Sequence, residues 1–200
     1  MRRILLATTN PGKLGEIREL LDGVPVEFLT LADLPPIAPP EETGRTFAEN
    51  ARLKAAYYAQ ATRLPTVAED SGLEVDALDG APGVESARYG GADAGYPEKC
   101  ARLAAAMAAA GSDDRTARFV CAVALVDEDQ VKFEAAGTIE GLIAPEPRGT
   151  GGFGYDPIFF YPPFGMTLAE AGPRKAEVSH RAKAFRALRK YLELAGPHGP

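Results

Sequence analysis

The chain has 200 residues, of which 46 % are hydrophobic and 25 % charged, the ordinary balance of a globular protein with a real core. Its net charge of −6 argues against a general nucleic-acid-binding protein, which would carry a basic stripe. A small anionic ligand needs only a few local cations and stays compatible with this charge. The apolar run at residues 3–7 is short and strand-like, so we predict no signal peptide, no membrane span and a cytoplasmic location.

Strands and helices alternate through the first half of the chain. Thr46 and Glu49 match a capping box and predict the start of a helix. A short buried strand is predicted to end just before Glu69-Asp70-Ser71-Gly72. The predicted elements are a strand at 3–7, a polar turn at 8–13, a helix to about residue 21, a strand at 26–31, a proline-rich loop at 33–45, a helix at 46–62, and strands at 66–68 and 73–78.

Hairpin-like patterns dominate the second half. Cys100 and Cys121 lie in apolar surroundings and are expected to be reduced core thiols. The predicted elements are a Gly-rich loop at 79–96, an Ala-rich helix at 97–110, a β-hairpin of strands at 119–126 and 131–137, a buried strand at 157–161, and a last helix from about residue 179 to 194.

This order of elements predicts an α/β fold with a mixed sheet flanked by helices. No internal repeat or break in composition marks a second folding domain. Residues 1–195 are therefore expected to form a single domain, followed by a short frayed tail at 196–200.

The polar turn at residues 8–13 lies between the first predicted strand and helix. Backbone amides at such a helix start favour anions, and Lys13 adds a full positive charge. The turn is not a Walker A loop, because its first glycine is missing and Leu14 stands where Ser or Thr would follow the lysine. By itself the pattern fits a phosphate-binding turn and an ordinary capped turn equally well. The residues concerned are Thr8, Thr9, Asn10, Pro11, Gly12 and Lys13.

Acidic residues occur at two places where a metal or a general base is expected. Asp70 follows a predicted buried strand, where a rigid backbone can present a carboxylate to a ligand. The pair Glu41-Glu42 lies in the proline-rich loop, and a solvated acidic loop is the simpler reading of that pair alone. Mg²⁺ needs only one or two carboxylates when phosphate oxygens complete its coordination shell.

The Gly-rich run at 149–154 is followed by aromatic and cationic side chains. Its glycines let the backbone approach a ligand closely, and Phe153 and Tyr155 can stack on a flat ring. Hydrogen-bond donors and positive charge follow at Lys175, His180 and Arg181. The combination indicates a nucleotide, although ordinary surface turns explain such a run about as often. A dinucleotide fingerprint is rejected, because the run neither follows the first strand nor opens a helix.

Seven short blocks occur in one order between residues 8 and 181. They are residues 8–13 (TTNPGK), 42–51 (ETGRTFAENA), 70–73 (DSGL), 80–83 (GAPG), 86–89 (SARY), 149–156 (GTGGFGYD) and 179–181 (SHR). Together they resemble the non-canonical purine nucleoside triphosphate pyrophosphatases, also called inosine/xanthosine triphosphate pyrophosphatases. No single block is specific to this family, but the occurrence of all seven in this order across nearly the whole chain is highly specific.

The resemblance implies an elongated mixed sheet flanked by helices, in two lobes with a central active-site cleft, and a homodimer. It also implies a Mg²⁺-dependent hydrolase that cuts ITP, dITP and XTP to the monophosphate and pyrophosphate and so cleanses the nucleotide pool. The partner would be a small-molecule nucleotide, with no nucleic acid and no membrane involved.

Site residues are assigned from this resemblance by motif position. The turn at residues 8–13 would hold phosphates together with Lys54. Asp70 would bind Mg²⁺ and act as the general base, Ser71 would contact the substrate, and either Glu41 or Glu42 would be the second metal ligand. The base pocket would consist of Phe153, Gly154, Tyr155, Asp156, Lys175, His180 and Arg181.

The pocket's cationic residues suggest how oxo-purines would be selected. Hypoxanthine and xanthine carry a 6-oxo acceptor where adenine carries a 6-amino donor, so a pocket lined with donors favours the oxo-purines. Three alternatives stay open: a non-catalytic nucleotide-binding protein, a pyrophosphatase for pyrimidine or methylated nucleotides, and a phosphatase that releases single phosphates.

Overall fold

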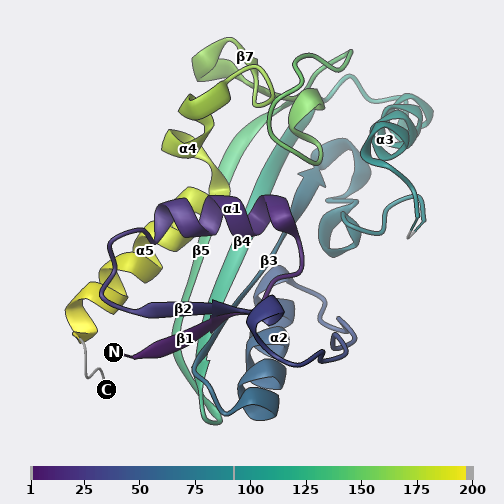
Figure 1. Cartoon of the computed structure of the whole chain (residues 1–200). Coiled ribbons are helices and arrows are strands. Elements are labelled where there is room, and N and C mark those ends of the chain that lie inside the picture. Colours follow the sequence, from purple (N-terminus) through teal and green to yellow (C-terminus); the bar gives the residue numbers. More distant parts are fainter. Residues whose placement is uncertain (1, 92, 197–200) are drawn as a thin grey trace. The chain divides into compact units, whose positions relative to one another are not determined.

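The computed structural model describes residues 2–91 and 93–196 and shows an α/β fold with a mixed sheet (Figure 1). The strand order is β2-β1-β3-β4-β5-β6-β7, with β1 parallel to β2 and β3, and β6 antiparallel to β5 and β7. The predicted fold class is confirmed. The elements are β1 (Arg3–Leu6), α1 (Pro11–Leu20), β2 (Glu27–Thr30), α2 (Phe47–Thr62), β3 (Thr66–Val75), α3 (Tyr96–Ala110), β4 (Thr116–Asp127), β5 (Gln130–Ile143), β6 (Phe159–Tyr161), β7 (Met166–Thr167), α4 (Lys175–Val178) and α5 (His180–Ala195).

The chain divides into two compact units, each with its own apolar core. Unit 1 contains residues 2–70, 121–137 and 180–196 of the described chain. Its core brings α1 and α5 together through Ile17, Phe185 and Leu188, which pack with Ile4 of β1 and Val123 of β4. Helix α1 is thereby fixed against α5, although the two helices lie at opposite ends of the sequence.

Unit 2 contains residues 71–91, 93–120 and 138–179. Leu103 and Met107 of α3 pack in its core with Leu73 of β3. The rings of Phe119 and Phe159 lie 4.6 Å apart between centroids in the same core. Among the described residues of the whole chain, no helix combines the length and apolarity that crossing a bilayer requires.

Several helix ends form where the sequence signals place them. The Asn10 side chain accepts a hydrogen bond from the Lys13 amide and caps α1, with Pro11 at the first helical position. The Thr46–Glu49 capping box at the start of α2 is confirmed, with both of its reciprocal hydrogen bonds present.

The central strand differs from its prediction. Two short strands separated by a loop were expected, whereas β3 runs unbroken from Thr66–Val75 through Glu69, Asp70, Ser71 and Gly72. Polar residues continue the strand because partners from helices neutralise the two acidic side chains, as described below. Gly72 is required there, since a Cβ at this position would lie 2.3 Å from the Ser86 hydroxyl.

Other boundaries are also corrected. Strands β4 and β5 extend beyond the predicted hairpin, and polar residues of the added parts, Arg118 and Glu140, form an ion pair at 3.3 Å. Residues 157–161 are not one strand: Asp156–Ile158 forms a 3-10 turn, which Pro157 favours, before β6 begins. The short elements β7 and α4 were not predicted. Of the expected tail at 196–200, only Gly196 belongs to the described residues.

Candidate active site

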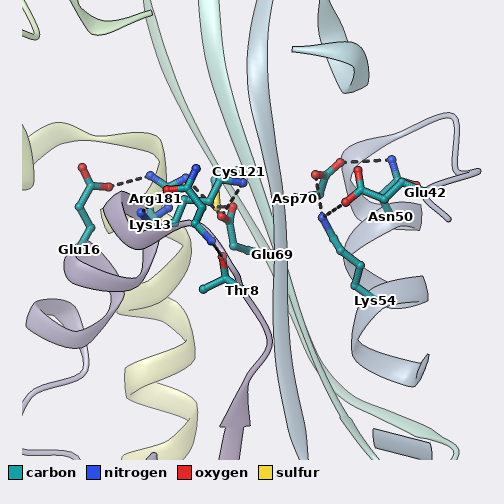
Figure 2. Close-up of polar contacts among 11 residues, drawn as sticks. Thr8, Lys13, Glu16, Glu42, Asn50, Lys54, Glu69, Asp70, Cys121 and Arg181 are labelled. Atoms are coloured by element: carbon teal, nitrogen blue, oxygen red, sulfur yellow. Dashed lines mark hydrogen bonds and ion pairs between the residues drawn. The ribbon is translucent and has the colours of Figure 1, made fainter. Parts of the chain in front are cut away.

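Asp70 of β3 is the centre of a polar cluster in unit 1 (Figure 2). The Lys54 ammonium lies 3.0 Å from Asp70 Oδ1 and 2.8 Å from Glu42 Oε1. The Asn50 amide nitrogen donates to Asp70 Oδ2 at 3.2 Å. Both oxygens of the Asp70 carboxylate are thus engaged, and a second carboxylate converges on the same lysine.

Helix α2 supplies two of these groups from one face. Asn50 and Lys54 are four residues apart and therefore lie one above the other on the helix. Asn50 is fully buried, and its side-chain oxygen accepts a hydrogen bond from the Gly44 amide at 2.8 Å. A Cβ on Gly44 would lie 2.6 Å from that oxygen, so the loop carrying Glu42 can approach α2 this closely only with glycine at position 44.

Burial and charge oppose each other at this cluster. Asp70 is 5 % exposed, and its burial raises the pKa of the carboxyl above the ordinary value although the Lys54 charge lowers it. For Lys54 the balance is reversed: burial lowers the pKa, but the charges of Asp70 and Glu42 outweigh it and raise the pKa. Asp70 is consequently a more basic carboxylate than an exposed aspartate, facing a lysine that stays charged.

Glu69, the residue before Asp70, lies in a separate polar cluster of the same unit. Lys13 Nζ is 2.8 Å and Arg181 Nη2 is 3.3 Å from Glu69 Oε1, and the Cys121 thiol donates to Glu69 Oε2 at 3.3 Å. Arg181 also reaches Glu16 Oε2 at 2.7 Å. Burial raises the pKa of Glu69, but Arg181 and then Lys13 outweigh it and hold the pKa well below its usual range.

The turn before α1 has the geometry expected of an anion site. The Asn10 amide donates to Thr8 Oγ1 at 3.2 Å, and Asn10 in turn caps the helix. Pro11 begins the helix and no acidic residue lies in its first turn. The turn therefore combines the positive end of the helix dipole with the charge of Lys13, whose side chain is 20 % exposed.

Unit 2 holds the Gly-rich part of the predicted base pocket. Lys175 Nζ lies 2.7 Å from Asp156 Oδ2 and 4.6 Å from the centroid of the Phe153 ring. The Phe153 amide donates to the same Asp156 oxygen at 2.8 Å. Gly152 has φ +69°, and a Cβ there would collide with Asp156, so this glycine is required by the turn itself.

The structure divides the predicted site residues between the two units. Tyr155 is 3 % exposed in the core of unit 2, where its hydroxyl donates to the Ser86 carbonyl at 3.0 Å; the half-buried Phe153 is the more accessible ring. His180 and Arg181 begin α5 in unit 1 and are 5 % and 1 % exposed. Of the acidic pair, Glu42 reaches Lys54, whereas Glu41 is exposed.

Several members of these clusters had no predicted role. Asn50, Glu69, Glu16 and Cys121 contact predicted site residues directly. The four-residue spacing of Asn50 and Lys54 on a predicted helix was an available signal for Asn50. The contacts of Cys121 and Glu16 join residues far apart in the sequence, and no local sequence pattern indicates them.

The Asp70 cluster has the donor chemistry that a hard divalent cation requires. Within the described residues, no group of three or more His, Cys, Asp and Glu side chains is arranged to hold a metal by itself. Glu42 and Asp70 nevertheless converge on one cation, the Lys54 ammonium, within 3.0 Å. Two carboxylates suffice for Mg²⁺ when substrate phosphates complete its shell, so these residues fit such an ion.

Comparisons with known proteins place this arrangement in one family. The family model described as Ham1 family matches residues 4–191. A dITP/XTP pyrophosphatase of Geobacter sulfurreducens is 46 % identical over 98 % of this chain and 99 % of its own length, and one of Thermus thermophilus is 50 % identical over 93 % and 89 %. A solved HAM1 protein from Coxiella burnetii superimposes with a TM-score of 0.88 at 43 % identity, covering 96 % of this chain and 98 % of its own. The chain belongs to the Ham1 family.

Proposed function

We propose that this protein is a Mg²⁺-dependent pyrophosphatase that hydrolyses ITP, dITP and XTP to the nucleoside monophosphate and pyrophosphate. The observation that supports the reaction most directly is the buried Asp70 carboxylate, held by Lys54 and Asn50 beside a second carboxylate from Glu42. The curated relatives from Geobacter sulfurreducens and Thermus thermophilus match this chain over 99 % and 89 % of their own length. Their name, dITP/XTP pyrophosphatase, supports the substrate class.

Asp70 is the proposed general base. Its carboxylate accepts a proton from the water that attacks the α-phosphorus, and pyrophosphate leaves as the second product. Burial, which raises the pKa of Asp70, strengthens it as a base, while Asn50 keeps its second oxygen fixed. Mg²⁺ bound with the triphosphate at Glu42 and Asp70 would neutralise charge on the leaving pyrophosphate.

Cationic groups would hold the triphosphate in position. Lys13 and the amides at the start of α1 are assigned to the phosphates, together with Lys54 and the side chains of Thr8 and Asn10. The remaining residues of the turn, Thr9, Pro11 and Gly12, place those amides. Positioning and charge stabilisation account for most of the rate gain in phosphoryl transfer, so a rigid cationic turn suits this chemistry.

The purine base of the nucleotide is assigned to the residues of the predicted base pocket. Within unit 2, Phe153 would stack on the purine and Lys175 would supply a donor for the 6-oxo group, with Gly154, Tyr155 and Asp156 shaping the pocket and Ser71 contacting the substrate. His180 and Arg181, which the resemblance also assigns to the base pocket, are buried in unit 1, where Arg181 pairs with Glu16 and Glu69. Asp156 supports this role for Lys175, because its carboxylate holds the ammonium 4.6 Å from the Phe153 ring centroid. Hydrogen bonds in a buried site can reject the wrong exocyclic group by about 10⁴-fold.

Product analysis tests the proposal. The protein is incubated with Mg²⁺ and ITP, with ATP and GTP in parallel, and the products are separated by anion-exchange chromatography. IMP and pyrophosphate from ITP, with ATP and GTP largely intact, is the expected result. IDP and phosphate would overturn attack at the α-phosphorus, and binding of ITP without turnover would leave a nucleotide-binding protein.

A homodimer and a cytoplasmic location complete the proposal, and both rest on the family resemblance. Light scattering coupled to gel filtration measures the assembly directly, since the chain mass is 21.2 kDa. A mass near twice that value is expected, and a mass near the single-chain value would contradict the dimer.

A further inference from the structure

Glu69 is the centre of the second polar cluster of unit 1 and has no part in the proposed proton transfer (Figure 2). Its side chain is 1 % exposed and is enclosed by Lys13, Arg181 and Cys121. We propose that Glu69 is a positioning residue of the nucleotide site, whose carboxylate, oriented by the Cys121 thiol, holds Lys13 and Arg181 in place. The proposal rests on the proposed function, which gives Lys13 a phosphate to bind.

One oxygen of Glu69 serves both cations. Lys13 Nζ lies 2.8 Å and Arg181 Nη2 3.3 Å from Oε1. Two positive groups this close would repel each other without the carboxylate between them. An ammonium has three donors, and Lys13 is 20 % exposed, so it can hold Glu69 with one donor and present another to a ligand.

Helix α1, which carries Lys13, is anchored a second time through Glu16. Glu16 follows Lys13 by three residues on α1 and lies 2.7 Å from Arg181 Nη1. Arg181 thus joins the carboxylate of β3 to that of α1, and α1 packs on α5 in the core of the unit. Lys13 is therefore held in one geometry before a ligand arrives, which lowers the entropy lost on binding.

The other oxygen of Glu69 is held by Cys121 of β4. The Cys121 thiol is fully buried and its Sγ lies 3.3 Å from Oε2. Burial, together with the charge of Glu69, raises the pKa of the thiol, so it stays protonated and can donate. With both oxygens engaged, the carboxylate has one orientation, and this orientation determines where the Lys13 ammonium lies.

Substitutions at Cys121 test the arrangement without changing any charge. Cys121→Ala removes the donor, and Cys121→Ser replaces it with a hydroxyl. Val123→Ala is the matched control, because it truncates another buried side chain of β4 in the same core without removing a polar contact. KM and kcat for ITP are measured for each variant per folded molecule, with thermal unfolding followed in parallel.

Cys121→Ala should raise the KM for ITP by about threefold to tenfold, the cost of ordering a side chain on binding, with kcat little changed because the Asp70 cluster is intact. Cys121→Ser should restore KM, and Val123→Ala should lower the melting temperature without raising KM. An unchanged KM in Cys121→Ala, an equal rise in Val123→Ala, or no rescue by serine would overturn the proposal.

A double variant tests whether Cys121 affects nucleotide binding through Lys13. In a Lys13→Met background, Cys121→Ala should no longer raise KM, because the side chain it positions has gone. A rise as large as in the unmodified protein would show that Cys121 acts by another route and would overturn the proposal.

Binding of inorganic tripolyphosphate, measured by calorimetry, separates this proposal from the proposed function. Cys121→Ala should weaken tripolyphosphate binding by about threefold to tenfold, whether or not ITP is hydrolysed. Absence of ITP turnover with this weakening present would overturn only the proposed reaction. No binding by the unmodified protein, or equal binding by Cys121→Ala, would overturn the positioning role.

Discussion

Glu69 and Asp70 are consecutive residues of β3, yet their carboxylates lie on opposite sides of the strand and have opposite pKa shifts (Figure 2). Burial raises both pKa values, but Arg181 and Lys13 outweigh it at Glu69, whereas Lys54 does not outweigh it at Asp70. Successive strand residues alternate between faces, so one dipeptide serves two clusters. The residue that stays firmly ionised is assigned to positioning, and the more basic one to proton transfer.

Asp70→Asn should lower kcat for ITP hydrolysis by about 10²–10⁴-fold, because the amide cannot accept the proton from water. The shape of the side chain is kept, but the amide offers one acceptor oxygen where the carboxylate offers two, so only one of Asn50 and Lys54 keeps its acceptor. The rate of pyrophosphate release measures the effect. Near-normal turnover in this variant would remove Asp70 from the role of general base.

Lys54→Met should shift the acid limb of the kcat/KM profile to higher pH. Lys54 is the strongest influence that lowers the pKa of Asp70, so its loss raises that pKa further, and the carboxyl must be ionised to act as a base. Lys54→Arg keeps the charge and is the control. An acid limb at the same pH in both variants would contradict this electrostatic coupling.

Asn50→Ala should lower kcat, because one oxygen of Asp70 loses its donor and the Gly44 amide loses its acceptor. The lost buried hydrogen bonds should also reduce the free energy of unfolding by about 1–3 kcal/mol. Thr46→Ala is the control: it removes the cap of α2, at about 1 kcal/mol, but leaves the Asp70 contact. Equal loss of kcat in both variants would mean that helix stability alone explains the effect.

Phe153→Leu should raise KM for ITP, because stacking of a base on an aromatic ring contributes about 1–3 kcal/mol. Binding of inorganic tripolyphosphate, which has no base, should not change. Calorimetry with both ligands makes the comparison. A parallel loss of tripolyphosphate binding would show that Phe153 supports the fold and not the base.

Glu69→Gln should lower the free energy of unfolding by about 3–5 kcal/mol at pH 7, since it leaves buried cations without their carboxylate. The folded-state pKa of Glu69 is depressed, so its stabilisation is present above the unfolded-state pKa of about 4.3 and is lost as pH falls toward the folded-state value. The difference between the two proteins should therefore shrink in acid.

Urea unfolding of both proteins at pH 7 and at about pH 3.5 measures this change. A difference that stays constant between the two pH values would contradict the lowered pKa of Glu69.

Local signals in the sequence predicted most of the fold. Asn10 with Pro11 and Thr46 with Glu49 mark helix starts through hydrogen bonds within one turn, so a short window contains the whole cause. The central strand was predicted wrongly because its acidic dipeptide resembles a loop. Only its distant partners, Lys13, Lys54 and Arg181, make a buried strand tolerate two carboxylates.

By itself the sequence determined the α/β class, the order of the main elements, the cationic turn before the first helix and the family resemblance, because these depend on near neighbours and on ordered motifs. Only the tertiary structure decided that Glu42 and not Glu41 reaches Lys54, that Glu69 and Asp70 face different clusters, and that Cys121 donates to Glu69. These outcomes depend on which helix packs beside which strand. That packing is set by cores whose members, such as Ile17 and Phe185, are far apart in the chain.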